Sequence, residues 1–243
     1  MLISPKRLIK KMFNLVGYNI VRTPKNPTFS LLGIRGLPIR TILDVGSNKG
    51  QFARHISSLF PEAQIYCFEP LPGPYKELKK WAEKQRSQKI KTFNIALGDR
   101  EGTSEILTHI QHTPSSSFLR TTSVCENLYS FTKEKLTTPV NLTTLDKWTK
   151  NLPRPLLPEI LIKLDVQGYE ERIIRGGQKT FIDAKACILE VCLDHLYEDQ
   201  STFKDISLLL YDLGYHYAGN LDQSYADNGH VIFIDAIFVR AEN

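Results

Sequence analysis

The sequence predicts an α/β fold built on a mostly parallel sheet. Short apolar runs without polar alternation recur along the chain, and stretches with helical spacing of apolar residues separate them. Strands that are apolar throughout are buried on both faces, as in parallel sheets that carry helices on each side. The last two runs follow each other without a helix between them, so we expect these two strands to form an antiparallel pair at one edge of the sheet.

We expect seven strands, because seven runs are rich in β-branched and apolar residues. They lie at residues 41–46, 65–69, 90–97, 159–166, 186–193, 215–219 and 231–240. The helices between them are expected at residues 51–60, 74–85, 168–177 and 203–214. Pro74 suits the first turn of the second of these helices, and Gly214 suits the end of the last one.

The regular alternation stops after the third strand. Residues 98–158 are rich in Ser, Thr and Pro, with further strands expected at residues 104–110 and 139–145. A segment of this length is too long for an ordinary connection between a strand and a helix. We therefore predict an insertion at 98–158 within a domain that covers residues 36–243.

Residues 1–35 are predicted to form a separate basic arm with a helix. Residues 1–40 hold eight basic and no acidic residues, whereas the rest of the chain has 23 basic and 26 acidic residues. Leu8, Met12, Leu15 and Val16 lie near one face of a helix, so we expect this helix to pack on the domain. A membrane surface, a nucleic acid or an anionic substrate are the alternative partners, and the arm could instead form a homodimer contact or cover a cofactor.

From composition and cysteine usage we expect a cytoplasmic protein. No apolar run reaches the length of a membrane-spanning helix, and the start of the chain lacks the cleavage site of a signal peptide. The cysteines are scattered without close pairs, and we expect buried free thiols. They are Cys67, Cys125, Cys187 and Cys192. These features favour a reducing compartment and no membrane span.

A glycine-containing turn, DVGSNKG, follows the first strand. Ligands of parallel α/β sheets bind at the carboxyl ends of strands, which is where this turn lies. Asn48 replaces the second glycine of the dinucleotide fingerprint, which a pyrophosphate would need. The polar turn suits the amino-acid tail of S-adenosylmethionine better than NAD. The residues assigned to the cofactor here are Asp44, Gly46, Ser47, Asn48 and Gly50.

The ends of the next two strands supply further cofactor candidates. Glu69 ends the second strand and is placed to accept hydrogen bonds from ribose hydroxyls, with Pro70 beside it. The alternative for Glu69 is a charge at the start of the following helix. Asp99 follows the third strand and could reach an adenine amino group, although turns often contain aspartate as well.

Five segments in order resemble the FkbM family of S-adenosylmethionine-dependent methyltransferases. They are DVGSNKGQFA, FEP, NIALGDREGTSEI, TPVNLTTLDKW and IKLDVQGYEERIIRGG, and the resemblance covers about residues 12–240. It implies a Rossmann-like class I methyltransferase domain that methylates hydroxyls on sugars, glycans and secondary metabolites. The family usually has D-V-E-G-x-E in the last segment, whereas this chain has Gln167 at the position of the first glutamate.

Methyl transfer to an alcohol needs an in-line geometry and a proton acceptor or a metal ion. Asp165 ends the fourth strand, where it could hold the cofactor, accept a proton or cap the following helix. His195, beyond the fifth strand, is the best candidate for a general base among the histidines. Mg²⁺ bound by Asp165 with Glu190 or Asp194 is the alternative, although no fixed ligand spacing supports a metal.

Other function classes fit the sequence less well. Methylation of RNA or protein would use the basic arm for an anionic partner, but no basic patch interleaved with exposed aromatic residues is present. A cofactor-binding subunit without catalysis is a further alternative. We expect a small-molecule or glycan acceptor and no DNA partner. The chain could form a homodimer. The sequence does not name the acceptor.

Overall fold

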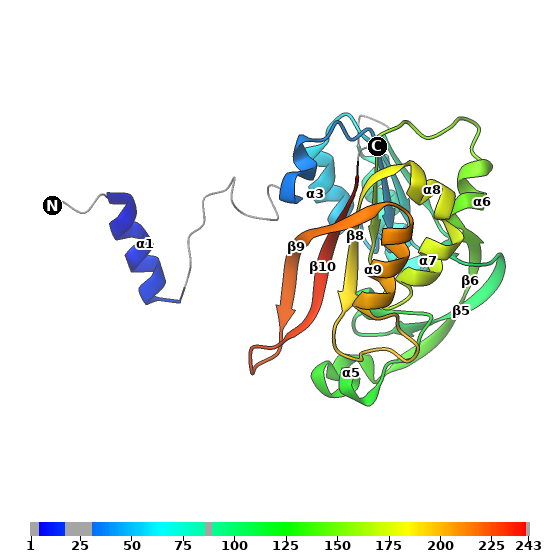
Figure 1. Ribbon diagram of the computed structural model, residues 1–243. Helices are drawn as coiled ribbons and strands as arrows, with labels where there is room; N and C mark the ends of the chain where they lie inside the picture. Colours follow the sequence, from blue (N-terminus) through cyan, green and yellow to red (C-terminus); the bar gives the residue numbers. More distant parts are fainter. Residues whose placement is uncertain (1–4, 18–30, 86–88, 242–243) are drawn as a thin grey trace.

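The computed structural model describes residues 5–17, 31–85 and 89–241. Its centre is a seven-stranded sheet in the order β3-β2-β1-β7-β8-β10-β9, in which β10 alone runs opposite to the other six strands (Figure 1). The strands are β1 (Thr41–Val45), β2 (Gln64–Phe68), β3 (Ile90–Phe93), β7 (Ile160–Leu164), β8 (Ala184–Cys192), β9 (Tyr215–Tyr225) and β10 (Val231–Arg240). The predicted α/β class, the mostly parallel sheet and the antiparallel last strand are confirmed.

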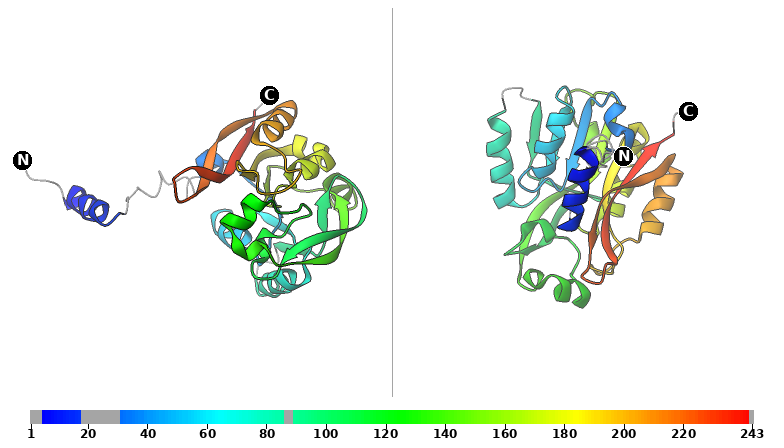
Figure 2. Two further views of the ribbon diagram at one scale, coloured as in Figure 1. Left: turned by 90° about the horizontal axis from the view of Figure 1, so that it is seen from below. Right: turned by 90° about the vertical axis from the view of Figure 1, so that its left-hand side faces the viewer.

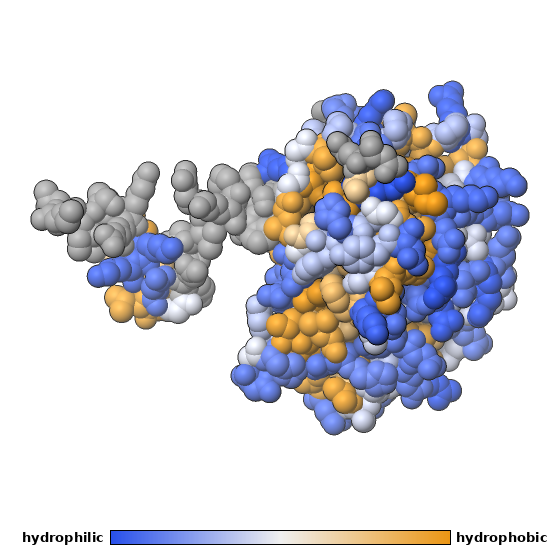
Figure 3. All heavy atoms as spheres, in the orientation of Figure 1, coloured by the Kyte–Doolittle hydropathy of each residue, from blue (hydrophilic) through white to orange (hydrophobic). Residues whose placement is uncertain are grey.

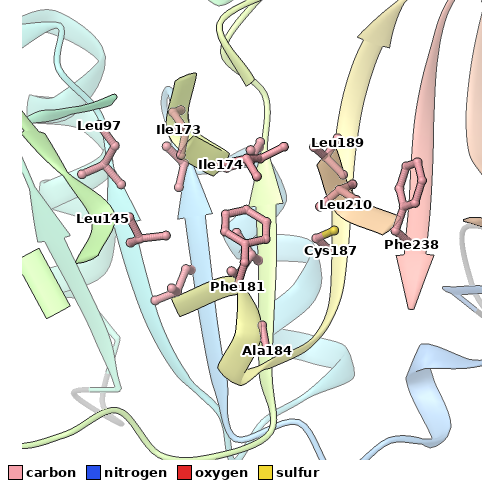
Figure 4. Packing of buried hydrophobic residues seen from close by; sticks show 14 of the residues in the cluster. Leu97, Leu145, Ile173, Ile174, Phe181, Ala184, Cys187, Leu189, Leu210 and Phe238 are labelled. Carbon is pink, nitrogen blue, oxygen red and sulfur yellow. The ribbon is translucent and has the colours of Figure 1, made fainter. Parts of the chain in front are cut away.

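Helices cover both faces of this sheet (Figures 1 and 2). One face packs against α3 (Gln51–Leu59), α4 (Pro72–Glu83) and the short η2 (Leu31–Gly36). The other face packs against α6 (Leu145–Lys150), α7 (Glu170–Gly176), α8 (Gln178–Asp183) and α9 (Phe203–Asp212). Figure 4 shows Ile173, Ile174 and Phe181 lying over the sheet, with Leu189 and Phe238 farther along it. Two apolar layers therefore fix the central strands, whose carboxyl ends carry the site.

The strand expected at residues 90–97 is two strands, and they belong to different sheets. β3 ends at Phe93, and β4 (Ala96–Gly98) pairs with β6 (Lys135–Thr144). Between them the Asn94 side chain donates to the backbone oxygens of Glu69 and Pro70, both at 2.9 Å. These hydrogen bonds replace the strand pairing at this point, and a continuous apolar run does not reveal them.

The insertion forms a second, three-stranded sheet in the order β4-β6-β5. β5 (Gly102–His109) pairs antiparallel with β6, close to the two strands expected in this segment. Its helix α5 (Ser123–Leu128) lies at the end of the central sheet where β8 ends (Figures 1 and 2). The insertion therefore lies over the carboxyl ends of the parallel strands. The division into an arm and one domain with an insertion remains a prediction.

Three short helices were not predicted, and one strand was predicted too short. α5, α6 and α8 have six residues each, too few to show a helical period. Thr122 and Thr144 are the N-caps of α5 and α6, because their side chains accept hydrogen bonds from Cys125 N and Lys147 N. β9 continues to Tyr225 rather than ending at residue 219. It is an edge strand and mostly polar, so its sequence resembles a turn.

The arm and the cysteines can also be compared with expectation. α1 (Pro5–Leu15) forms as predicted, but residues 9–17 are exposed, so they lack the predicted packing on the domain. All four cysteines are buried free thiols, as expected. Among the described helices, none has the length and apolar content that a bilayer span requires.

Trp148 of α6 joins the insertion to the core of the central sheet. Its ring makes edge contacts with Phe68, Phe93 and Tyr66, at centroid distances of 4.7, 5.1 and 5.4 Å. Trp148 is 8% exposed, so removal of the indole leaves a cavity lined by these rings.

We expect Trp148→Ala to lower the free energy of unfolding by about 3 to 5 kcal/mol. Trp81→Ala is the matched control, because Trp81 is only half-buried on α4 and should cost less. Urea unfolding followed by circular dichroism measures both. Equal losses of unfolding free energy in the two variants would contradict the prediction that burial of Trp148 makes α6 important for stability.

Candidate active site

A cavity of about 320 Å³ lies at the carboxyl ends of β1, β2 and β7. The turn at residues 46–48 and the segment at residues 69–71 form one wall, and Asp165 and Val166 form another. Residues of the insertion, including Thr113 and Phe118, also line it. β1 and β7 are the neighbours from which the chain continues to opposite sides of the sheet. This is the switch point at which sheets of this class bind ligands.

The two glycines of the turn have packing roles. Gly46 has a φ of 79°, and a Cβ there would overlap the backbone carbonyl oxygen of Asp165. Gly50 has a φ of 86°, and its Cβ would lie 2.9 Å from Leu78 Cδ1 and 3.3 Å from the ring of Trp81. Gly46 therefore lets β1 and β7 approach at the cavity, whereas Gly50 lets α3 pack on α4.

Glu69 is held at the cavity wall by two backbone donors. Asn48 N donates to its Oε2 and Leu71 N donates to its Oε1, both at 2.8 Å. Each carboxylate oxygen keeps a second acceptor position. Burial raises the pKa of Glu69 to about 7, because it outweighs these hydrogen bonds. Glu69 can therefore accept two hydroxyl donors from one side.

Asp165, directly after β7, is paired with a buried ammonium group of that strand. Lys163 Nζ lies 2.6 Å from Asp165 Oδ2, and the Lys163 side chain is 8% exposed. Burial lowers the pKa of Lys163, but the charges of Asp165, Asp44 and Glu190 outweigh burial and raise it above the ordinary value. Lys163 is therefore a permanent cation beneath the cavity.

Asp44 lies opposite Lys163 in the pairing of β1 with β7. It is fully buried, and neither carboxyl oxygen has a hydrogen-bond partner among the described residues. Burial raises the pKa of Asp44 to about 6, against the attraction of Lys163. The Ser47 hydroxyl donates to the backbone oxygen of Asp44 at 2.7 Å, which closes the turn above it.

Gln167 connects three side chains through one amide. Its Nε2 donates to Asp165 Oδ1 at 2.9 Å and to Glu190 Oε1 at 2.5 Å, and its Oε1 accepts from the Tyr197 hydroxyl at 2.7 Å. The backbone oxygen of Gln167 accepts from the Ser117 hydroxyl at 2.7 Å. Gln167 has a φ of 57°, a left-handed conformation that few non-glycine residues adopt. These contacts fix both carboxylates relative to the insertion.

Glu190 of β8 lies where two cavities meet. Together with Asp165 it lines both the first cavity and a second one of about 340 Å³. Asp235 of β10 faces Glu190 in the strand pairing. Burial, followed by the charge of Asp165, raises the pKa of Glu190 well above its ordinary value. Burial also raises the pKa of Asp235 to about 6.

The second cavity has aromatic walls and a polar end. Rings from the insertion, β10 and the segment after β8 line it, and Asp165, Gln167 and Glu190 lie at the end shared with the first cavity. The aromatic residues are Tyr129, Phe131, Tyr197 and Phe233. This arrangement suits a ligand with apolar faces and hydroxyl groups.

The structure brings most of the predicted site residues together. Those on the wall of the first cavity are Gly46, Ser47, Asn48, Glu69, Pro70 and Asp165. Asp44 and Gly50 do not line this cavity. Asp99 is exposed, with its Oδ2 3.9 Å from Arg172 Nη1. His195 is exposed as well, and its backbone oxygen accepts from the Thr122 hydroxyl. Neither Asp99 nor His195 lines a cavity described above.

The expected metal alternative gains no support. No group of three or more His, Cys, Asp or Glu residues in the described part of the chain is arranged to hold a metal ion. The two oxygens of Asp165 face the Lys163 ammonium and the Gln167 amide. Asp194 lies 2.8 Å from His230 Nε2. Asp165 and Asp194 therefore already have cationic or hydrogen-bonding partners among the described residues.

Three residues of the site were missed from the sequence: Lys163, Tyr197 and Asp235. Lys163 and Asp235 stand within the apolar strands ILIKL and VIFIDAIFVR. A charged residue in a buried strand requires a partner, and this signal was available. Tyr197 follows β8 in an irregular segment, so nothing in the pattern placed its hydroxyl beside Gln167.

The strand order, the cavity at the switch point and its acidic wall define a Rossmann-like methyltransferase. Residues 44–217 match the model of the methyltransferase FkbM domain. The chain therefore belongs to the FkbM methyltransferase family, as the resemblance in the sequence indicated.

The chain is also similar to a curated relative and to solved structures. The chain is 28% identical over 178 residues to the 2-O-methyltransferase NoeI of Sinorhizobium fredii, covering 71% of this chain and 72% of that protein. The METTL16 methyltransferase domain is 10% identical with a TM-score of 0.50, covering 98% of this chain and 77% of the other. An FkbM methyltransferase from Methylobacillus flagellatus KT has 10% identity and a TM-score of 0.49, covering 83% of this chain and 44% of the other.

The buried carboxyl groups predict that stability falls as the pH rises. Burial raises the pKa of Glu170 to about 7 and that of Asp44 to about 6. The unfolded chain binds these protons less tightly, with carboxyl pKa values near 4. The stability linked to them is complete below about pH 4 and is lost as the pH rises through about 6 to 7.

We therefore expect a lower free energy of unfolding at pH 8 than at pH 5.5, measured by urea unfolding. Glu170→Gln should reduce this difference, by on the order of 2 kcal/mol at most. The glutamine oxygen can still accept from Val166 N and Gly168 N, as Glu170 does. Glu198→Gln changes an exposed carboxyl group and serves as the control. An unchanged pH dependence in Glu170→Gln would contradict the prediction.

Proposed function

We propose that this methyltransferase uses S-adenosylmethionine to methylate a hydroxyl group of a sugar, glycan or secondary metabolite. The observation that carries the proposal is the junction of two cavities at Asp165 and Glu190. One cavity has a polar turn and an acidic wall, and the other has aromatic walls. The name of the similar 2-O-methyltransferase supports a hydroxyl acceptor.

The first cavity suits the proposed cofactor in shape and charge. Glu69 offers two free acceptor positions to a ribose diol, and Leu71, Ile95, Leu97 and Phe118 give an apolar wall for an adenine ring. Asp165 puts a carboxylate at the other end, which favours a ligand with ammonium and sulfonium groups. The diphosphate of NAD would meet this carboxylate unfavourably.

S-adenosylmethionine supplies a methyl group bonded to a positively charged sulfur. Transfer forms a bond from the acceptor oxygen to the methyl carbon and breaks the bond from that carbon to sulfur. The acceptor hydroxyl loses its proton, so a base must stand where the two cavities meet. We assign this proton to Glu190, because Gln167 binds its Oε1 and leaves Oε2 to face the acceptor.

Asp165 and His195 have different places in this proposal from the predicted ones. The oxygens of Asp165 are directed by Lys163 and Gln167, so we assign Asp165 to cofactor binding and not to proton transfer. The exposed ring of His195 lies outside both cavities, so Glu190 replaces it as the proposed base. A raised pKa makes the ionised Glu190 a stronger base than an exposed carboxylate.

Calorimetric titration tests the cofactor. We expect S-adenosylmethionine to bind, and Glu69→Ala to weaken binding by at least about tenfold, because hydrogen bonds to a charged acceptor are lost. Wild-type affinity should rise from pH 6 to pH 8, since the pKa of Glu69 is about 7. Glu62→Ala removes an exposed carboxylate as the control. Binding of NAD in place of S-adenosylmethionine would refute the proposed cofactor.

Methyl transfer from labelled S-adenosylmethionine to a panel of methyl glycosides and phenols tests the base. We expect Glu190→Gln to lower the rate by about 10²- to 10⁴-fold while cofactor affinity stays within about threefold. His195→Gln should retain wild-type transfer and its pH profile. The assignment fails if His195→Gln is the inactive variant and Glu190→Gln remains active.

A further inference from the structure

Helix α1 has a surface that the proposed methyl transfer does not use. Ile9, Met12 and Phe13 are 50, 61 and 46% exposed, and Leu15 beyond them is 87% exposed. A helix of eleven residues normally buries such side chains. Figure 3 shows hydrophobic atoms gathered along one edge of this helix and hydrophilic atoms along the other.

The helical period separates the two kinds of residue. At about 100° per residue, Ile9, Met12 and Phe13 fall within about one third of the circumference. Lys10 and Lys11 fall on the opposite side, and both are exposed. α1 is therefore amphipathic, and the charges on its polar face are all positive, since residues 1–40 contain no acidic residue.

Charge along the chain points to the kind of partner. Residues 1–40 contain eight Lys and Arg residues and no acidic residue, whereas residues 41–243 contain 23 basic and 26 acidic residues. A nucleic acid would pair with the basic face and leave the apolar edge in water. A protein groove would cover the apolar edge without a need for positive charge. An anionic lipid surface is complementary to both faces at once.

We propose that α1 lies in the headgroup region of an anionic membrane and attaches this methyltransferase to its surface. The apolar edge enters the boundary between headgroups and acyl chains, and the lysines remain beside the lipid phosphates. A helix of this length binds weakly and reversibly. The attraction is electrostatic in part, so salt should weaken it.

Cosedimentation of the full chain with vesicles tests the proposal. We expect binding to vesicles of phosphatidylcholine with phosphatidylglycerol, and at least about tenfold weaker binding to phosphatidylcholine alone, since basic residues near an anionic surface add to the attraction. Two double variants should each lose binding at least about tenfold: Met12→Glu with Phe13→Glu, and Lys10→Glu with Lys11→Glu.

The matched control is Lys79→Glu with Lys80→Glu on α4, which makes the same change in net charge away from α1. It should bind like the wild type. Equal loss in this control, or equal binding to both kinds of vesicle, would overturn the proposal. Sedimentation that instead shows a dimer, lost with the Met12 and Phe13 changes and without vesicle binding, would assign the apolar edge to a second copy of the chain. Cofactor affinity should be unchanged in all these variants, which separates this test from that of the proposed function.

Discussion

The buried ammonium of Lys163 is the charge on which the site depends. Asp44, Glu190 and Asp235 come from three different strands and Asp165 directly follows a fourth, yet the charges of all four interact with this one lysine. Burying several carboxylates together is costly unless a cation pairs with them or they hold protons. Both solutions are present, since Asp165 pairs with Lys163 at 2.6 Å and burial raises the pKa of the other three.

Gln167 extends this arrangement from β7 to β8 and to the insertion. A glutamate at this position, as in the usual family pattern, would have no hydrogen atoms to offer Asp165 and Glu190 when ionised. It would also add a third negative charge beside them. The Gln167 amide instead donates hydrogen bonds to Asp165 and Glu190, and its oxygen accepts one from Tyr197. The departure from the family pattern is therefore compatible with a proton acceptor at Glu190.

The sequence was sufficient for the features that depend on local pattern. Continuous apolar runs located the buried strands, and the turn at Gly46 and the acid at Glu69 located the first cavity. It was insufficient where contacts join distant segments. Asn94 ends β3 through hydrogen bonds to residues after β2, and Tyr197 meets Gln167 across 30 positions of the chain. His195 is chemically suited to a base, but its position depends on how the segment after β8 turns, which no periodicity describes.

In the proposed function, the end shared by the two cavities carries out methyl transfer, and the aromatic wall of the second cavity selects the acceptor. The shared end consists of Asp165 and Glu190 at the ends of rigid central strands, where small displacements would alter the geometry of transfer. The aromatic wall comes largely from the insertion, through Tyr129 and Phe131, and from the segment that contains Tyr197. Loops on a rigid scaffold tolerate change better than the strands that carry them. In the proposed function, the acceptor could therefore change through substitutions in the insertion while Lys163, Gln167 and Glu190 keep their contacts.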